Sequence, residues 1–204
     1  MKGSLKPVIE QLETYFSKIN DRYYNGELVK PVITVSPDDT KGAYGWCTSW
    51  KVWKDSDVDN PDDGYYEINI CAEHLARQFE NVVGTLMHEM VHLYNLQKEI
   101  KDTSRGGTYH NKHFKATAEQ HGLTVEQGEK YGWCITSLND EAREFVNSLD
   151  GKGFDIHREK PIKIKSASKS SSRKYVCPCC GLIVRATKEV RIICADCGVE
   201  LLQE

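Results

Sequence analysis

The sequence predicts an α+β protein in which helices pack on a small sheet, followed by a small, cysteine-rich β domain. Three observations predict this class. Apolar residues recur at helical spacing in several segments of the first 150 residues, and short β-branched runs lie between those segments. Five of the eight cysteines lie in the last 28 residues. A chain of 204 residues is long enough for one modest domain and a smaller second one.

Four helices are predicted from the apolar periodicity. The first covers residues 5–24 and the second covers 79–97, where apolar side chains recur every three or four positions. A third is predicted over 110–121. The last helix begins after Asn139 or Asp140, either of which can cap its first turn.

Short strands are predicted between the first two helices. Apolar or alternating runs at 32–35, 44–47, 50–53 and 65–70 favour strands, because proline, glycine and aspartate bound them. The polar, glycine-containing stretch 101–108 is predicted to be a loop.

Charge is distributed unevenly along the chain, whose formal net charge is −3. Residues 1–150 have a net charge of −8, residues 151–174 one of +6, and residues 175–204 one of −1. The middle segment is rich in serine and lysine and cannot bury a core. We therefore predict a folded domain at 1–150, a basic flexible linker at 151–174 and a second domain at 175–204.

The most informative motif lies inside the predicted helix 79–97. It reads His88-Glu89-Met90-Val91-His92, which places two imidazoles one turn apart on one helix face. Such a pair can share a zinc ion, and the glutamate beside them can take the proton of a metal-bound water. Two ordinary surface histidines are the alternative, but apolar neighbours favour a buried face.

A zinc site of this kind needs a third ligand from elsewhere in the chain. The metzincin pattern is excluded because Asn95 and Lys98 stand where it requires glycine and histidine. The remaining candidates follow the helix: His110, His113, Glu119 and His121. Spacing alone does not decide among them, but His110 opens the next predicted helix after a glycine-rich loop, and this position favours it.

The C-terminal cysteines form two CxxCG sequences, with 13 residues between Cys180 and Cys194. Cys177, Cys180, Cys194 and Cys197 are predicted to hold a structural zinc ion in a zinc ribbon, and the glycine after each pair suits the turn around the metal. Cys179 is left over. We expect the segments 182–184 and 190–193 to form the hairpin of this ribbon.

Four stretches together resemble the SprT-like family of metallopeptidases, whose members include a protease of DNA–protein crosslinks. They are residues 19–33, 66–70, 86–92 and 110–114. The resemblance implies a zincin-like fold, zinc ligands His88, His92 and His110, and Glu89 as the general base. It also implies a protein substrate attached to DNA, and SprT-like proteins often end in a zinc ribbon.

The expected function is therefore zinc-dependent hydrolysis of peptide bonds by a metalloendopeptidase with one catalytic and one structural Zn²⁺. We expect the peptide to lie along a sheet edge near residues 68–70, and DNA to contact the linker and the ribbon. No apolar run is long enough for a membrane span or a signal peptide, so we expect a cytoplasmic monomer without membrane contact. The alternatives are a non-catalytic zinc module that binds nucleic acid or protein, and a zinc hydrolase of a non-peptide substrate.

Overall fold

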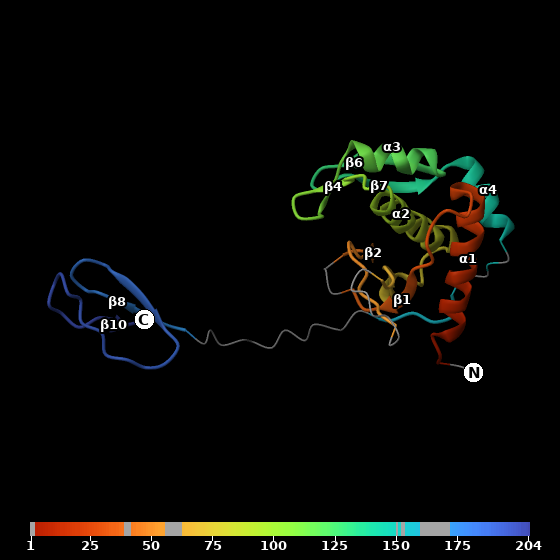
Figure 1. Ribbon diagram of the computed structural model, residues 1–204. Coiled ribbons are helices and arrows are strands. Elements are labelled where there is room, and N and C mark those ends of the chain that lie inside the picture. The colour runs from red at the N-terminus through yellow and green to blue at the C-terminus, as the bar shows by residue number, and fades with distance from the viewer. Residues whose placement is uncertain (1–2, 39–41, 56–62, 150, 152–153, 160–171) are drawn as a thin grey trace. The chain divides into compact units, whose positions relative to one another are not determined.

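The computed structural model describes residues 3–38, 42–55, 63–149, 151, 154–159 and 172–204 (Figure 1). The chain divides into two compact units, the body within residues 1–160 and the ribbon within 161–204. In the described residues the body contains four α-helices and two small sheets, and the ribbon contains one three-stranded sheet. The predicted α+β class is confirmed. No helix in these described ranges is long and apolar enough to cross a membrane.

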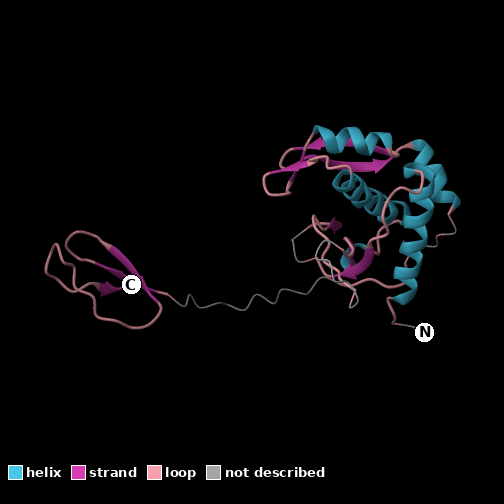
Figure 2. Cartoon of the chain, in the orientation of Figure 1, coloured by secondary structure: helices cyan, strands magenta, loops and turns pink. Residues whose placement is uncertain are grey.

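The helix α2 (Phe79–Gln97) is the centre of the body and has the predicted bounds. It packs against both sheets and against the other helices, and it lies between the two groups of strands in Figure 2. The helix α1 (Lys6–Tyr24) covers one side of it through apolar residues such as Leu12 and Phe16. A left-handed Asn25 ends α1, with a φ of 54°.

The first sheet has the strand order β1-β3-β2. The middle strand β3 (Glu67–Cys71) is parallel to β1 (Val32–Ser36) and antiparallel to β2 (Gly45–Cys47). Both edges of β3 are therefore paired. The strand predicted at 50–53 is not formed, and Trp53 only makes a single bridge to Tyr65.

The second sheet has the order β4-β5-β7-β6 and was largely missed in the sequence. Its strands are β4 (Thr103–Ser104), β5 (Tyr109–His110), β6 (Leu123–Gly128) and β7 (Gly132–Leu138). The stretch predicted as a loop thus contains β4, and His110 lies on β5 rather than on the following helix. The helix α3 (Lys112–Gln120) begins after Asn111, whose side chain accepts hydrogen bonds from the amides of His113 and Phe114.

The body ends with α4 (Asp140–Ser148), capped by Asn139 as one of the two predicted alternatives. The described residues beyond it still contact the body: Phe154 and Ile156 pack on its core, and Arg158 pairs with Glu73 at 2.5 Å. The first part of the predicted linker therefore lies against the body. Residues 160–171 lie outside the described residues, so a flexible linker stays a prediction.

The ribbon pairs its strands differently from the prediction. Its sheet has the order β10-β8-β9, formed by β10 (Leu202–Gln203), β8 (Arg173–Val176) and β9 (Ile183–Ala186). The hairpin partner of β9 is thus β8, which starts inside the predicted linker, and not the segment 190–193. That segment makes a single bridge, from Ile193 to Glu200.

Candidate metal centre

Three histidines from two elements meet in the body. His88 and His92 lie one turn apart on α2, with ring centroids 5.1 Å apart. His110 approaches from β5, and its Nε2 lies 3.1 Å from the Nε2 of both His88 and His92. The pairing of β5 with β7, through the His110 amide and the Tyr131 carbonyl, fixes the backbone at this point.

The donor set of this cluster fits a zinc ion. The Nδ1 atom of His88 lies 3.0 Å from the Thr136 hydroxyl, and the Nδ1 atom of His92 lies 2.7 Å from Asp102 Oδ2. When these Nδ1 atoms carry the protons, the Nε2 lone pairs face one another and need a shared cation. Tetrahedral Zn–N bonds of about 2.05 Å separate nitrogens by about 3.3 Å, close to the spacing of this cluster.

Apolar packing holds the three rings and influences their protonation. The Phe114 ring lies within 4.7 Å of all three imidazole centroids. Burial lowers the pKa of His88 and lowers that of His110 to about 4, which favours the neutral, ligand form of both. For His92 burial acts in the same direction, but the hydrogen bond to Asp102 and the negative charges of Glu89 and Asp102 together outweigh it and raise the pKa.

Glu89 lies beside the cluster and is only 5% exposed. Its Oε1 atom is 3.3 Å from the point where a Cβ on Gly45 would stand, so β2 passes directly over it. Burial raises the pKa of Glu89 to about 7, while the nearby His92 ring and, to a smaller extent, the Cys47 backbone oppose this rise. A cation between the histidines would favour the carboxylate form further.

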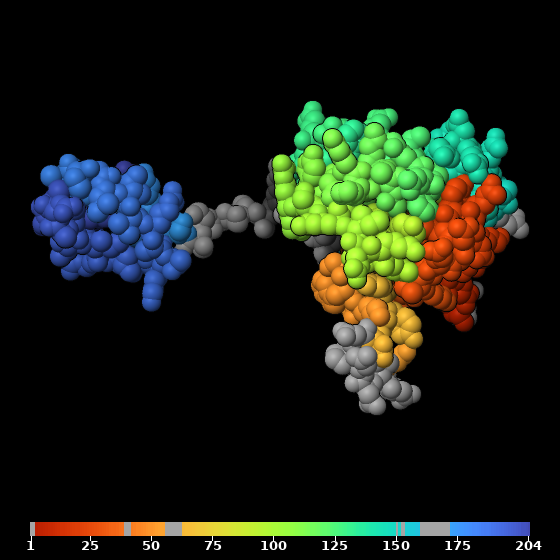
Figure 3. All heavy atoms as spheres, turned by 45° about the horizontal axis from the view of Figure 1, so that its top comes forward, coloured from red at the N-terminus to blue at the C-terminus, as the bar shows by residue number. Residues whose placement is uncertain are grey.

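The cluster opens into a cleft with two walls. One wall is β2 with the loop after it, up to the exposed Trp50. The other is the end of α2 at Leu96 together with the segment that follows, as far as His110. These two segments, orange and yellow-green, lie side by side on the surface in Figure 3. His88, Glu89 and His92 line the cleft floor, so a substrate can reach them.

The other candidates for a third ligand lie elsewhere. His113 is exposed on α3, and Glu119 is exposed and pairs with Lys115 at 3.6 Å. The ring of His121 stacks on Tyr24 at 4.2 Å, and its Nδ1 donates a hydrogen bond to the Thr117 carbonyl at 2.7 Å. Only His110 joins His88 and His92 among the described residues that could hold a metal.

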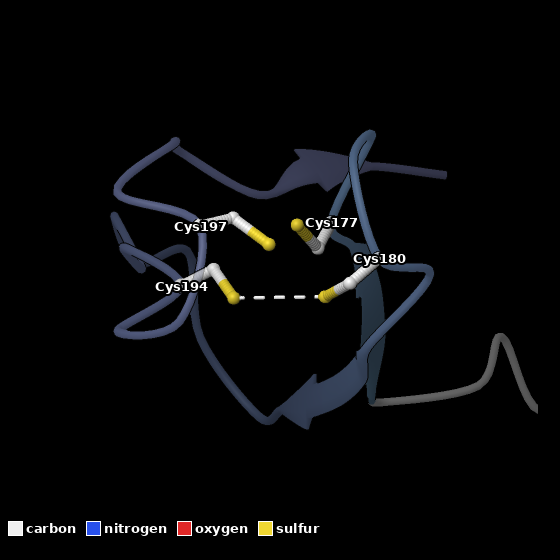
Figure 4. Close-up of side chains that lie close together, drawn as sticks. All are labelled: Cys177, Cys180, Cys194 and Cys197. Carbon is white, nitrogen blue, oxygen red and sulfur yellow. Dashed lines mark hydrogen bonds between the residues drawn. The ribbon is translucent and has the colours of Figure 1, made fainter.

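The ribbon contains a second cluster that could hold zinc. The thiols of Cys177, Cys180, Cys194 and Cys197 point toward one another, with all ligand atoms within 4.8 Å (Figure 4). The sulfurs of Cys180 and Cys194 are 3.7 Å apart, and tetrahedral Zn–S bonds of about 2.3 Å predict about 3.8 Å.

Each CxxC turn has the same geometry. The amide of Gly181 donates to the Cys177 carbonyl at 3.0 Å, and that of Gly198 donates to the Cys194 carbonyl at 2.8 Å. Both glycines have positive φ, at 74° and 68°. The Cys180 and Cys179 amides also lower the pKa of the Cys177 thiol, which favours the thiolate that binds metal. Cys179 itself is exposed and outside the cluster.

Sequence reasoning missed the residues that surround the ligands. Asp102, Thr136 and Gly45 contact the ligands or the carboxylate, yet they lie on a predicted loop, an unpredicted strand and a short edge strand. No spacing in the sequence predicts their contact with the site, because the chain must fold back to bring these residues to α2.

A helix with H-E-x-x-H, a third histidine from a separate strand and a buried carboxylate in an open cleft together define a zinc metallopeptidase-like domain. The model of the SprT-like family matches residues 12–136. The chain belongs to the SprT-like family, as the resemblance of its motifs indicated. No curated protein and no solved structure matches the chain.

Proposed function

We propose that this protein is a zinc-dependent metalloendopeptidase that hydrolyses peptide bonds. The observation that carries this proposal is the convergence of three Nε2 atoms, 3.1 Å apart in two of the pairs, beside the buried Glu89 in an open cleft. A site with only a structural role needs neither a carboxylate at that position nor access from solvent.

His88, His92 and His110 would hold the zinc ion. Bound there, zinc lowers the pKa of a coordinated water to about 7 and polarises a carbonyl. Glu89 takes the proton from the attacking water on its carboxylate and later delivers it to the nitrogen of the leaving amine.

Within the part of the chain that the structure describes, β2 pairs with β3 along one edge only, and we place an extended peptide along its other edge. The expected edge near residues 68–70 was wrong, because β3 is the middle strand of its sheet. The Tyr44 carbonyl and the Thr48 amide bond to β3, so the alternation of an antiparallel pair turns the main chain of Gly45 and Cys47 the other way. A substrate strand added at this edge would place its carbonyls beside Glu89.

The substrate we propose is a protein bound or crosslinked to DNA, and its support is the family resemblance together with charge. The body is acidic, with a net charge of −8 over residues 1–150, and repels phosphate. The segment 151–174, with net charge +6, would contact DNA together with the ribbon. We propose that the enzyme acts as a cytoplasmic monomer.

The test is cleavage of a purified DNA-binding protein by the full-length, zinc-loaded chain, with and without DNA. Glu89→Gln removes the proton acceptor but keeps the size of the side chain, and the turnover rate should fall by about 10²- to 10⁴-fold. Glu99→Gln is the matched control, because Glu99 is exposed beyond the end of α2. It should cleave like the unsubstituted chain.

Three outcomes would contradict parts of the proposal. Equal cleavage by the Glu89→Gln and unsubstituted proteins would exclude Glu89 as the base. Equal rates with and without DNA would remove the role of the linker and ribbon. A zinc-loaded chain that binds DNA but cleaves no protein would favour the non-catalytic module, and turnover of small esters alone would favour a non-peptide hydrolase.

A further inference from the structure

We propose that Asp102 is the positioning residue of the metal centre: its side chain orients His92, and its main chain fixes the strand that carries His110. This inference rests on the metal centre of the proposed function. It adds a residue that contacts the ligands without being one of them, on a segment between α2 and β5.

The side chain of Asp102 holds His92 in one tautomer. Its Oδ2 atom lies 2.7 Å from the Nδ1 of His92, and both groups are largely buried, with 11% and 15% of their side chains exposed. A carboxylate can only accept, so the proton stays on Nδ1 and the Nε2 lone pair points at the cluster. Such a partner also makes the imidazole a stronger ligand.

A buried network fixes the carboxylate itself. Asn95 Nδ2 donates to the same Oδ2 atom at 3.1 Å, and the Thr117 hydroxyl donates to Asn95 Oδ1 at 2.8 Å. Asn95 is fully buried one turn after His92, and Thr117 comes from α3. The orientation of Asp102 is thus set by α2 and α3 together.

The main chain of Asp102 reaches the third ligand. Its carbonyl accepts a hydrogen bond from the Asn111 amide at 2.9 Å, and the next residue, Thr103, pairs with His110 in the β4–β5 ladder. The Asn111 side chain adds a second bond, from Nδ2 to the Lys101 carbonyl at 2.8 Å. One residue therefore connects the ligand of α2 to the ligand of β5.

Neither of the other two proposed ligands has a charged hydrogen-bond partner on its Nδ1 atom. His88 faces the neutral hydroxyl of Thr136, and the Nδ1 of His110 is buried with no hydrogen-bond partner among the described residues. Within these residues Asp102 is the carboxylate that bonds to a ring nitrogen of the cluster. Its removal should therefore weaken the centre more than removal of the Thr136 hydroxyl.

The experiment is a Co²⁺ titration of the full-length, metal-free protein, followed by absorption spectroscopy. The thiolates of the ribbon give charge-transfer bands that the histidine site lacks, so the ribbon is an internal reference in every sample. Asp102→Ala should bind Co²⁺ at the histidine site about 10- to 100-fold more weakly. Asp102→Asn, which keeps the shape but removes the charge, should shift the visible bands of that site.

Two control variants separate positioning from general stability. Asp140→Asn changes a fully exposed carboxylate and should leave affinity and spectrum unchanged. Asn20→Leu removes two buried hydrogen bonds to the main chain of Leu28, outside the network of Asp102. It should lower the free energy of unfolding and keep the visible bands in place.

The results distinguish this inference from the proposed function. If both Asp102 variants match Asp140→Asn in affinity and spectrum, Asp102 has no positioning role, and if Asp102→Ala does not fold, Asp102→Asn decides alone. If the unsubstituted chain takes up Co²⁺ only at the ribbon, the histidine centre itself fails, and the role of Asp102 fails with it.

Discussion

Gly45 shows how closely β2 approaches the proposed general base. A Cβ at this position would lie 2.6 Å from the Asn69 carbonyl and 3.3 Å from Glu89 Oε1. The first contact is with the backbone of the neighbouring strand, which cannot move without breaking the sheet. Gly45 does not have a positive φ, so its backbone conformation does not require glycine. The lack of space for a Cβ is what requires glycine here.

Gly45→Ala should accordingly destabilise the body, by about 1–3 kcal/mol. Gly84→Ala is the matched substitution with the opposite expectation. Gly84 lies inside α2, its added Cβ would meet Leu138 at an ordinary 3.8 Å, and alanine in a helix interior gains about 0.5–1 kcal/mol. Urea unfolding measures the change in the free energy of unfolding for both variants. If the two changes have the same sign, the lack of space around Gly45 does not explain its glycine.

Among the residues of the site, the sequence predicted those whose spacing follows the helix period. His88, Glu89 and His92 lie within one turn, so their juxtaposition follows from α2 alone. His110 could only be favoured over His113, because the path of 17 intervening residues is not encoded in spacing. Asp102 and Gly45 depend on tertiary contacts, which no local pattern reports.

The ring of His121 joins three helices at one point. It directly follows α3, stacks on Tyr24 at the end of α1 and lies 4.8 Å from Tyr94 of α2. Burial lowers its pKa below the ordinary value of 6.5, while the hydrogen bond to the Thr117 carbonyl opposes this shift. The neutral imidazole is therefore the form that the folded body favours.

This burial predicts an acid-sensitive contribution to stability. Because the unfolded chain binds the His121 proton more readily, the contribution is present above pH 6.5 and is lost as the pH falls below it. His121→Phe keeps an aromatic ring but cannot titrate. Between pH 7 and pH 5 its free energy of unfolding should fall less steeply than that of the unsubstituted chain, by at most about 1.4 kcal/mol per pH unit.

The measurement is urea unfolding of both proteins across this pH range. The clustered histidines His88, His92 and His110 are the same in both chains, so their effect cancels in the difference. Equal pH slopes would show that His121 titrates alike in the folded and unfolded states.

Elements with strong apolar periodicity were predicted well, and short or polar ones were not. The helix α2 has the predicted bounds and α1 differs by one residue, because both bury a continuous stripe. The strands β6 and β7 were missed because glutamate, glutamine, threonine and serine occupy their outer face. In the ribbon, β9 pairs with β8, whose sequence Arg173–Val176 looks like the end of a basic linker.

At the scale of the whole chain, the proposed contact with DNA rests on the basic segment 151–174, whose net charge is +6. Residues 160–171 lie outside the described residues, yet they include Lys163, Lys165 and Lys169. If each lysine neutralises one phosphate, changing all three to glutamine should reduce the slope of log affinity against log salt by up to about 2.7 for duplex DNA.

The control replaces three lysines of the acidic body, Lys6, Lys18 and Lys30, in the same way. Fluorescence anisotropy with a labelled duplex at several salt concentrations measures both slopes. A slope that changes equally in the two variants would mean that the basic segment has no special contact with DNA.

The two metal clusters differ in what surrounds them. In the ribbon the buried core consists of Tyr175, Cys177, Cys194 and Leu201, so two metal ligands are half of that core. In the body a large apolar core and the Phe114 ring support the histidines independently of any ion. We therefore expect the ribbon to need zinc in order to fold, whereas the body should fold without it and need zinc only for the proposed activity. When zinc is scarce, the chain should keep a folded but inactive body and lose the structure of its ribbon.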